Sequence, residues 1–307
     1  MNIRKFKDIL AQRIMLLVSG FVVSLAFLMA FGLFLRAKPI LDIKPLNALL
    51  FSASWNPGRG DFGLANFIIS TLGVTSIAII IAVPLSVFTA IYLSEYSHKR
   101  FKEIAMPVID LLAGISPVVY GVWGMLAIVP LVRDYLMPFF TVHFPFFPFI
   151  SDNYTGFSTL TAGIVLAVMT FPIIISVTEE VMSRVPFELR EASLALGATK
   201  WQTIKHTVLK KAKAGIIAAI ILGLSRSFGE TMAVLMVAGC TIQGFPLSIF
   251  DPAYPLPALI ANTYGEMMSI PMYDAAVLLA AFILLIVTML CNIVGWGILL
   301  RIERKGM

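Results

Sequence analysis

The sequence predicts an all-α integral membrane protein with six transmembrane helices. Of its 307 residues, 59% are apolar and only 13% are charged, and the mean hydropathy is +0.92. Soluble domains are typically about 45–50% apolar and about 25% charged. The composition therefore excludes a soluble enzyme, a disordered tail and a nucleic-acid-binding module. The net charge of +6 does not indicate nucleic acid, because the basic residues flank apolar runs, as in membrane proteins.

Six apolar stretches account for the predicted spans, since a bilayer-crossing helix needs about 20 mostly apolar residues. They cover residues 14–35, 67–93, 104–132, 158–178, 214–238 and 275–300. The first stretch is longer than the apolar region of a cleaved signal peptide, about 7–15 residues, so we expect a retained helix. The third is interrupted by Pro107, Gly114 and Pro117.

Lysine and arginine residues are distributed unequally between the two sides of the predicted membrane. Segments 1–13, 94–103, 179–213 and 301–307 together hold 17 of them, whereas segments 36–66, 133–157 and 239–274 hold 5. Because basic loops remain in the cytoplasm, both termini are expected there, with the chain in the cell inner membrane. Cys240 and Cys291 are too few and too far apart for a disulfide framework or a metal cluster, so no metal site is expected.

Two outer loops carry apolar residues whose use the sequence leaves open. Residues 137–149 (MPFFTVHFPFFPF) are rich in Phe and Pro, which favours an aromatic segment at the membrane interface over a surface for an external partner. Residues 244–274 include Pro255, Pro257, Leu259 and Ile260 and are expected to hold a short amphipathic helix. Contact with the membrane and contact with a partner are equally good interpretations of that helix.

The cytoplasmic loop 179–213 has the pattern of a helix, a glycine turn and a second helix. Pro186 suits the first turn of a helix, and Gly197 suits its end. Thr199 and Gln202 have the spacing of a capping box. The two apolar stripes are Leu189, Ala192, Ser193 and Leu196, then Trp201, Ile204 and Val208. Such a pair could lie flat on the membrane, helped by nearby lysines, or insert into a soluble partner.

The order of residues in this loop resembles the EAA loop of ABC importer permeases. That motif runs E-A-A, three residues, G, nine residues, I-x-L-P. Glu191, Ala192, Gly197 and Leu209 match it, while Ser193, Thr207 and Lys210 replace an alanine, an isoleucine and a proline. The resemblance implies that the loop docks into a cleft on an ATPase subunit through Glu191, Ala192, Ser193 and Gly197.

Arg226 and Glu230 are charged residues inside the fifth predicted span. They are four residues apart and are expected on one helix face. A charge at the bilayer midplane costs about 2.5–3.5 kcal/mol on insertion scales, so such residues face a bundle interior or an aqueous path. We hypothesise that both line a substrate path, because the planar guanidinium suits an oxyanion. The alternative is an ion pair that fixes packing against another subunit.

Other intramembrane residues have a structural interpretation beside a functional one. Asp110 is expected near the cytoplasmic interface, in a structural role. Pro84, Pro117 and Pro172 interrupt the second, third and fourth spans and are expected to kink them. The kinks are either static curvature or hinges along a path.

The sequence lacks the motifs of an enzyme. There is no Walker A sequence G-x-x-x-x-G-K-[ST], the three histidines are scattered, and no G-x-S-x-G elbow occurs. No catalytic residue and no cofactor are therefore expected in this chain. If it moves a solute actively, the energy must come from partner proteins.

Further motifs extend the resemblance over residues 55–300. They are Trp55-Asn56-Pro57 with Phe62-Gly63, residues 116–124 (SPVVYGVWG), residues 226–234 (RSFGETMAV) and residues 260–262 (IAN). The chain is similar to PstC-like permease subunits of phosphate-specific ABC importers. This similarity implies the type I importer permease fold, with residues 1–66 as an N-terminal helix and outer loop, and residues 67–300 as a core containing the coupling loop 179–213.

The same resemblance implies an assembly that works by alternating access. Its partners would be a homologous PstA-like permease, two ATPase subunits that bind ATP and Mg, and an external phosphate-binding protein. Membrane lipid surrounds it, a sensor kinase or regulator is a further candidate partner, and no nucleic acid is expected. Alternatives are a permease for sulfate, molybdate or phosphonate, a passive anion channel, which would leave the coupling loop unexplained, or a signalling scaffold.

Overall fold

The computed structural model describes residues 3–306 apart from 145, 243, 267–269 and 271, and it is all-α except for one small hairpin. Five helices in this described part are long and apolar enough to cross a membrane by length and composition. They are Lys7–Ile43, Ala65–Tyr96, Pro117–His143, Thr159–Ser183 and Tyr273–Ile302. The predicted class of fold, an all-α membrane protein, is therefore confirmed, although six spans were predicted.

The N-terminal half of the chain contains the hairpin and the first packed helices. Its elements are α1 (Ile3–Ile43), α2 (Leu46–Phe51), β1 (Trp55–Asn56), β2 (Asp61–Phe62), α3 (Ala65–Ile91), α4 (Lys99–Ala113), α5 (Pro117–Trp123), α6 (Val129–Leu131) and α7 (Met137–His143). A π-helical turn, Tyr92–Tyr96, continues α3, and two more π-helical turns join α5, α6 and α7.

The C-terminal half contains the loop 179–213 and the last long helix. Its elements are α8 (Thr159–Ser183), α9 (Phe187–Ala195), α10 (Lys200–Thr203), α11 (Leu209–Gly229), α12 (Met232–Val237), α13 (Leu256–Thr263) and α14 (Tyr273–Gly306). A π-helical turn, Ile204–Val208, joins α10 to α11.

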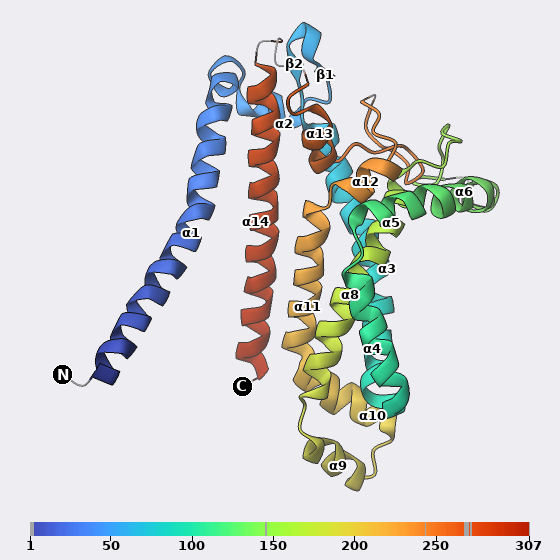
Figure 1. Ribbon diagram of the computed structural model, residues 1–307. Helices are drawn as coiled ribbons and strands as arrows, with labels where there is room; N and C mark the ends of the chain where they lie inside the picture. Colours follow the sequence, from blue (N-terminus) through green and yellow to red (C-terminus); the bar gives the residue numbers. More distant parts are fainter. Residues whose placement is uncertain (1–2, 145, 243, 267–269, 271, 307) are drawn as a thin grey trace.

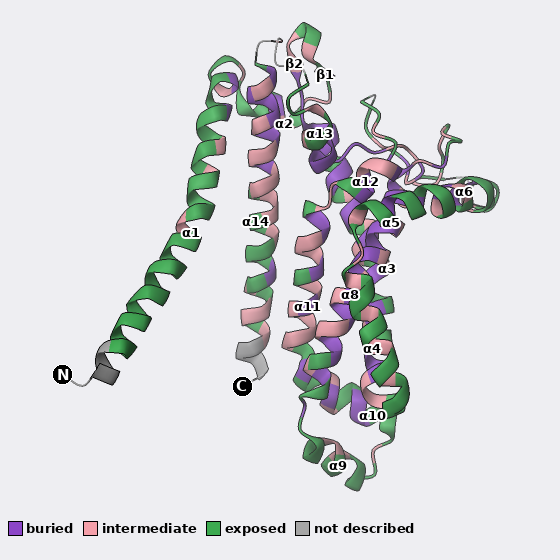
Figure 2. Ribbon diagram, viewed as in Figure 1, coloured by how far each residue is buried: buried purple, intermediate pink, exposed green. Residues whose placement is uncertain are grey.

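The helices α3, α11 and α4 pack around α8, whereas α14 packs against α11 and α1. Figure 1 shows α1 leaning away from α14 toward its N-terminus, and Figure 2 shows that α1 is exposed along most of its length while buried residues concentrate in α3 and α8. Both chain ends and the loop with α9 and α10 lie at one end of the bundle, opposite the hairpin. This is the arrangement expected if the basic segments share one side of the membrane.

The hairpin end is fastened by aromatic packing around Trp55. Trp55 pairs with Phe62 across the two strands, and its ring meets the rings of Phe62 and Phe67 at centroid distances of 5.6 and 5.2 Å. The residue after the second strand, Gly63, needs to be glycine because a Cβ there would lie 2.3 Å from the carbonyl oxygen of Ser52. The structure thus explains the Trp55 and Phe62-Gly63 motifs by their packing at the hairpin.

The predicted third span is not one helix, which corrects the assignment of residues 104–132. The helix α4 ends at Ala113, and α5 begins at Pro117 and runs away from the direction of α4 (Figure 1). Proline disfavours helical backbone at the preceding residue, and Ser116 has an extended ψ of 138°. Tyr120 donates a hydrogen bond of 2.8 Å to the carbonyl oxygen of Leu112, which spans the break. Pro117 therefore opens a new helix, whereas Pro84 and Pro172 lie inside continuous helices.

The described residues of the two loops that were predicted to lie on the outer side fold against the chain itself. In residues 137–149 the rings of Phe140, Phe144 and Phe149 pack together, and Phe140 also meets Phe250. The short helix predicted within 244–274 is α13, but its leading apolar residues are buried in the core rather than free for a membrane or a partner. Part of that loop, 267–269 and 271, falls outside the described residues.

Candidate functional site

The loop 179–213 has the predicted helix, glycine turn and helix. Gly197 has a φ of +84°, the left-handed conformation that glycine adopts without a Cβ penalty. Its N–H donates to the carbonyl oxygen of Leu194 at 2.9 Å, and the N–H of Ala198 donates to that of Ser193 at 3.3 Å. This pair of bonds is a Schellman motif, so the glycine ends α9 and turns the chain into α10.

Polar contacts make the loop compact. The predicted capping box is confirmed: the hydroxyl of Thr199 accepts from the N–H of Gln202 at 3.3 Å, and the Gln202 side chain accepts from the N–H of Thr199 at 2.8 Å. The hydroxyls of Ser193 and Thr203 lie 3.0 Å apart and join α9 to α10. The two short helices are therefore held at a fixed angle.

The two predicted apolar stripes have different environments. Ile204 and Val208 are buried against Met182 and Val185 and anchor the loop to the helix bundle. The first helix instead presents apolar residues outward, and Leu196 is 90% exposed. Glu191, Ala192 and Gly197 are exposed as well, and α9 projects beyond the ends of α8 and α11 (Figure 1). This shape favours insertion into a partner over a helix pair lying flat on the membrane.

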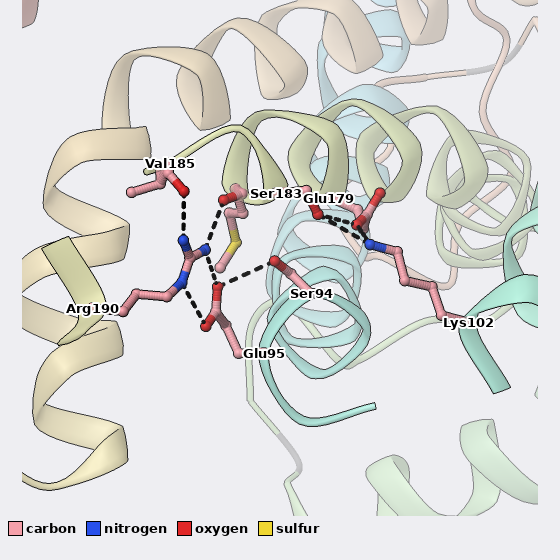
Figure 3. Close-up of polar contacts among 8 residues, drawn as sticks. Ser94, Glu95, Lys102, Glu179, Ser183, Val185 and Arg190 are labelled. Atoms are coloured by element: carbon pink, nitrogen blue, oxygen red, sulfur yellow. Dashed lines mark hydrogen bonds and ion pairs between the residues drawn. The ribbon is translucent and has the colours of Figure 1, made fainter. Parts of the chain in front are cut away.

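An ion pair that sequence reasoning missed fastens this loop to the end of α3. Arg190 donates from Nη2 to Oε1 of Glu95 at 2.7 Å and from Nε to Oε2 at 3.2 Å (Figure 3). The side chains are only 14% and 7% exposed. The two residues are 95 positions apart, so no local pattern in the sequence indicates the pair.

A second polar group joins α4 to α8 on the same side of the protein. Lys102 forms an ion pair with Glu179, and its Nζ donates to the hydroxyl of Ser183 at 3.0 Å (Figure 3). The Ser183 hydroxyl donates in turn to Oε1 of Glu179 at 2.5 Å. Glu179 is buried, and the lysine compensates its charge.

The predicted fifth span is broken at the charged residues, which corrects the expectation of one helix over 214–238. The helix α11 ends at Gly229, Glu230 has an extended ψ of 126°, and α12 begins at Met232. Oε1 of Glu230 accepts from the backbone N–H groups of Thr231 at 3.1 Å and Ala233 at 3.4 Å. Arg226 and Glu230 therefore do not share a helix face, and no ion pair joins them among the described residues.

Arg226 is half-buried near the C-terminal end of α11. The residues on either side of it form hydrogen bonds to other helices. The hydroxyl of Ser225 donates to the side-chain oxygen of Asn292 on α14, and the hydroxyl of Ser227 lies 3.1 Å from that of Thr170 on α8. Glu230 borders a small hollow together with Thr71, Thr75 and other residues. The charged groups thus lie beside the break between α11 and α12, flanked by buried hydroxyls.

Asp110 lies on the exposed side of α4 and accepts a hydrogen bond of 2.8 Å from the hydroxyl of Ser176 on α8. This contact joins two helices, as the structural interpretation expects. The described part of the chain holds no cluster of three or more metal-ligating side chains.

Comparison with known proteins gives related sequences over most of the chain. Residues 82–305 match the family described as "binding-protein-dependent transport system inner membrane component". The phosphate transport system permease protein PstC of Xylella fastidiosa is 38% identical over 84% of this chain and 80% of its own length. The probable PstC of Methanocaldococcus jannaschii is 32% identical over 92% of this chain and 91% of its own length.

A solved structure supports the fold. An inward-facing form of the MetNI methionine ABC transporter matches with a TM-score of 0.52 at 20% identity, over 76% of this chain and 93% of that chain. At this identity the likeness concerns the arrangement of helices alone.

Proposed function

The chain belongs to the family of binding-protein-dependent transport system inner membrane components, as a PstC-like permease, and we propose that it imports inorganic phosphate as one subunit of an ATP-driven transporter. The observation that carries this proposal is the 38% identity to a phosphate transport system permease over four-fifths of that protein. A permease subunit is not itself an enzyme. ATP hydrolysis is therefore assigned to partner subunits, and the sequence, which lacks a Walker A motif, supports this assignment.

We propose an assembly of this chain with a homologous PstA-like permease, two ATPase subunits that bind ATP and Mg, and an external phosphate-binding protein. A sensor kinase or regulator is a further candidate partner. The distribution of basic residues supports cytoplasmic termini and a cytoplasmic coupling loop, and residues 67–300 would form the permease core.

In this proposal the coupling loop is the contact with an ATPase subunit. Glu191, Ala192 and Gly197 are exposed and Ser193 is half-buried, and the helix α9 projects past the helix bundle (Figure 1). The Schellman motif and the capping box make the loop rigid, so a movement of the ATPase is transmitted rather than absorbed. Alternating access would follow from that movement.

Arg226 and Glu230 are proposed to lie along the phosphate path. Because the carboxylate of Glu230 caps α12, the guanidinium of Arg226 is not neutralised by it and keeps its charge for an anion. Phosphate is an anion at neutral pH, and an arginine fork binds its oxygens through charge-assisted hydrogen bonds. The break between α11 and α12 supports this placement, since irregular backbone at membrane depth is tolerated where it lines a cavity.

The test is ATP hydrolysis by the four-component complex reconstituted in liposomes, with and without phosphate-loaded binding protein. We expect the binding protein to stimulate ATP hydrolysis when it carries phosphate and not when it carries another anion, and we expect Gly197→Glu to abolish this stimulation. Equal stimulation with sulfate or molybdate would contradict the assignment of phosphate as the substrate. If no anion stimulates hydrolysis, the chain is not part of an importer of this kind.

A further inference from the structure

We propose that Arg190 and Glu95 form the positioning link through which the coupling loop moves α3, and with it the helices of the phosphate path. The link rests on the proposed function, because it assigns a route for the movement that ATP binding causes. Neither residue is among those that the EAA-like motif singles out.

The guanidinium of Arg190 connects three parts of the chain at once. It forms two hydrogen bonds to the carboxylate of Glu95, in the π-helical turn that continues α3. It also donates to the carbonyl oxygens of Val185 at 2.5 Å and Met182 at 3.0 Å, where α8 ends (Figure 3). The coupling helix α9 is thus joined to both α3 and α8 by a single side chain.

Apolar packing attaches the loop to α3 through its second helix, where Ile204 and Val208 cluster with Ile91, whereas α9 itself has little such support. A hollow of about 760 Å³ lies beside the pair and is bordered by Glu95, Arg190, Phe187 and Leu194, among others. The backbone of α9 packs chiefly against α10 and the turn Ile204–Val208. Because side chains do not fill the hollow, polar contacts rather than close packing hold α9 to α3. The helix α10 makes a separate contact with the π-helical turn that continues α3, a cation–π contact with Lys200 Nζ 4.5 Å from the centre of the Tyr96 ring.

From α3 the movement reaches the proposed path through tightly packed helices. Among the described helices the most extensive contact joins α3 to α8, and α8 also packs on α11, which carries Arg226. The Lys102–Glu179 ion pair ties α4 to the end of α8 on the same side. A pull on Arg190 therefore acts on α3, α8 and α4 together.

The chemistry of the pair makes it sensitive to single substitutions. Removing one partner of a buried ion pair leaves the other as an uncompensated charge. Lysine is not an equivalent replacement for Arg190, because an ammonium cannot form the bidentate contact to Glu95 while also donating to two carbonyl oxygens. The substitutions Glu95→Gln and Arg190→Lys should therefore loosen the link without changing the exposed residues that are proposed to meet the ATPase.

The experiment measures phosphate uptake and ATP hydrolysis in the same proteoliposomes for Glu95→Gln and Arg190→Lys. The expected result is a fall of about tenfold in phosphate imported per ATP hydrolysed, the range seen for residues that carry coupling between sites. The matched controls are Glu180→Gln and Arg184→Gln, which break an exposed ion pair in the same loop and should keep the wild-type ratio.

A covalent replacement of the link separates coupling from stability. In a variant with Cys240 and Cys291 changed to serine, Glu95→Cys and Arg190→Cys are joined by a short bis-maleimide. We expect cross-linking of this double-cysteine variant to restore the wild-type ratio of phosphate imported to ATP hydrolysed. This result is expected even if Glu95→Gln and Arg190→Lys assemble poorly. An unchanged ratio in the two single variants, or no recovery after cross-linking, would overturn the link. If wild-type complex shows no phosphate-dependent hydrolysis, the proposed function fails instead.

Discussion

The hydroxyl of Ser193 lies 3.0 Å from the hydroxyl of Thr203, so the two helices of the coupling loop share a hydrogen bond. Ser193 occupies the position at which the EAA motif has its second alanine. The departure from the motif therefore has a structural consequence: a polar contact between α9 and α10 that an alanine cannot make. Ser193 faces this contact, while Glu191 and Ala192 face outward.

The first prediction concerns this hydrogen bond. Ser193→Ala restores the residue of the motif and removes one partly buried hydrogen bond, which contributes about 1 kcal/mol. We expect a small fall in the thermal unfolding temperature of the purified complex, with ATP hydrolysis and uptake unchanged. Thr203→Val should have the same effect, and the double variant should be no worse than either single one. Additive losses would show that the two hydroxyls act separately.

The local features of the chain were predictable from its sequence. The capping box of Thr199 and Gln202 and the turn at Gly197 depend on residues within a few positions of one another, and both are found. The apolar runs likewise predict the long helices, because a stretch of about 20 mostly apolar residues is by itself sufficient to indicate a bilayer-crossing helix.

The break after Gly229 and the long-range contacts were not predictable. The predicted fifth span runs through Gly229 without a proline, so the sequence does not reveal that the backbone leaves the helix there, whereas Gly114 and Pro117 did mark the interruption of the third span. The position of Glu230 depends on the start of α12, which hydropathy merges with α11. The pair of Arg190 and Glu95 exists only once α3 and α8 have packed together.

The second prediction tests the left-handed conformation of Gly197. No neighbouring atom lies within 4 Å of the position of an added Cβ, so the cost of substitution is conformational, about 1–2 kcal/mol for an ordinary residue. Asparagine tolerates this conformation better than a β-branched residue does. We expect Gly197→Asn to keep most of the phosphate-stimulated ATP hydrolysis and Gly197→Val to lose most of it. Equal activity of both variants would contradict a requirement for positive φ.

The third prediction concerns the charge of Arg226. Arg226→Gln should lower phosphate uptake by at least about tenfold, because it removes a charge-assisted hydrogen bond to the anion. Arg226→Lys keeps the charge but not the planar fork, and should retain an intermediate rate. Uptake of ³²P-labelled phosphate into proteoliposomes at several concentrations measures both variants. Wild-type uptake by Arg226→Gln would remove this residue from the path.

The fourth prediction separates the two roles of Glu230. As the cap of α12, its side chain needs an acceptor oxygen, which glutamine also supplies. Glu230→Gln should therefore keep the thermal stability of the complex, whereas Glu230→Ala should lose about 1 kcal/mol. Any change in the phosphate dependence of uptake by Glu230→Gln then reports the charge alone. Destabilisation by glutamine as large as that by alanine would contradict the capping role.

The fifth prediction concerns the half-buried Cys240, in the loop after α12. Burial raises the pKa of its thiol to about 11, because the charged thiolate is poorly solvated there. The raised pKa keeps the thiol protonated at neutral pH, and only the thiolate reacts with a maleimide. In a Cys291→Ser variant, labelling at pH 7.5 should be about 100-fold slower than for the unfolded chain, since two pH units separate the thiol pKa values. The rate should rise about tenfold per pH unit up to pH 10, beyond the pH at which the unfolded chain levels off. A plateau near pH 9 would show that water reaches the sulfur, and that the loop does not cover Cys240.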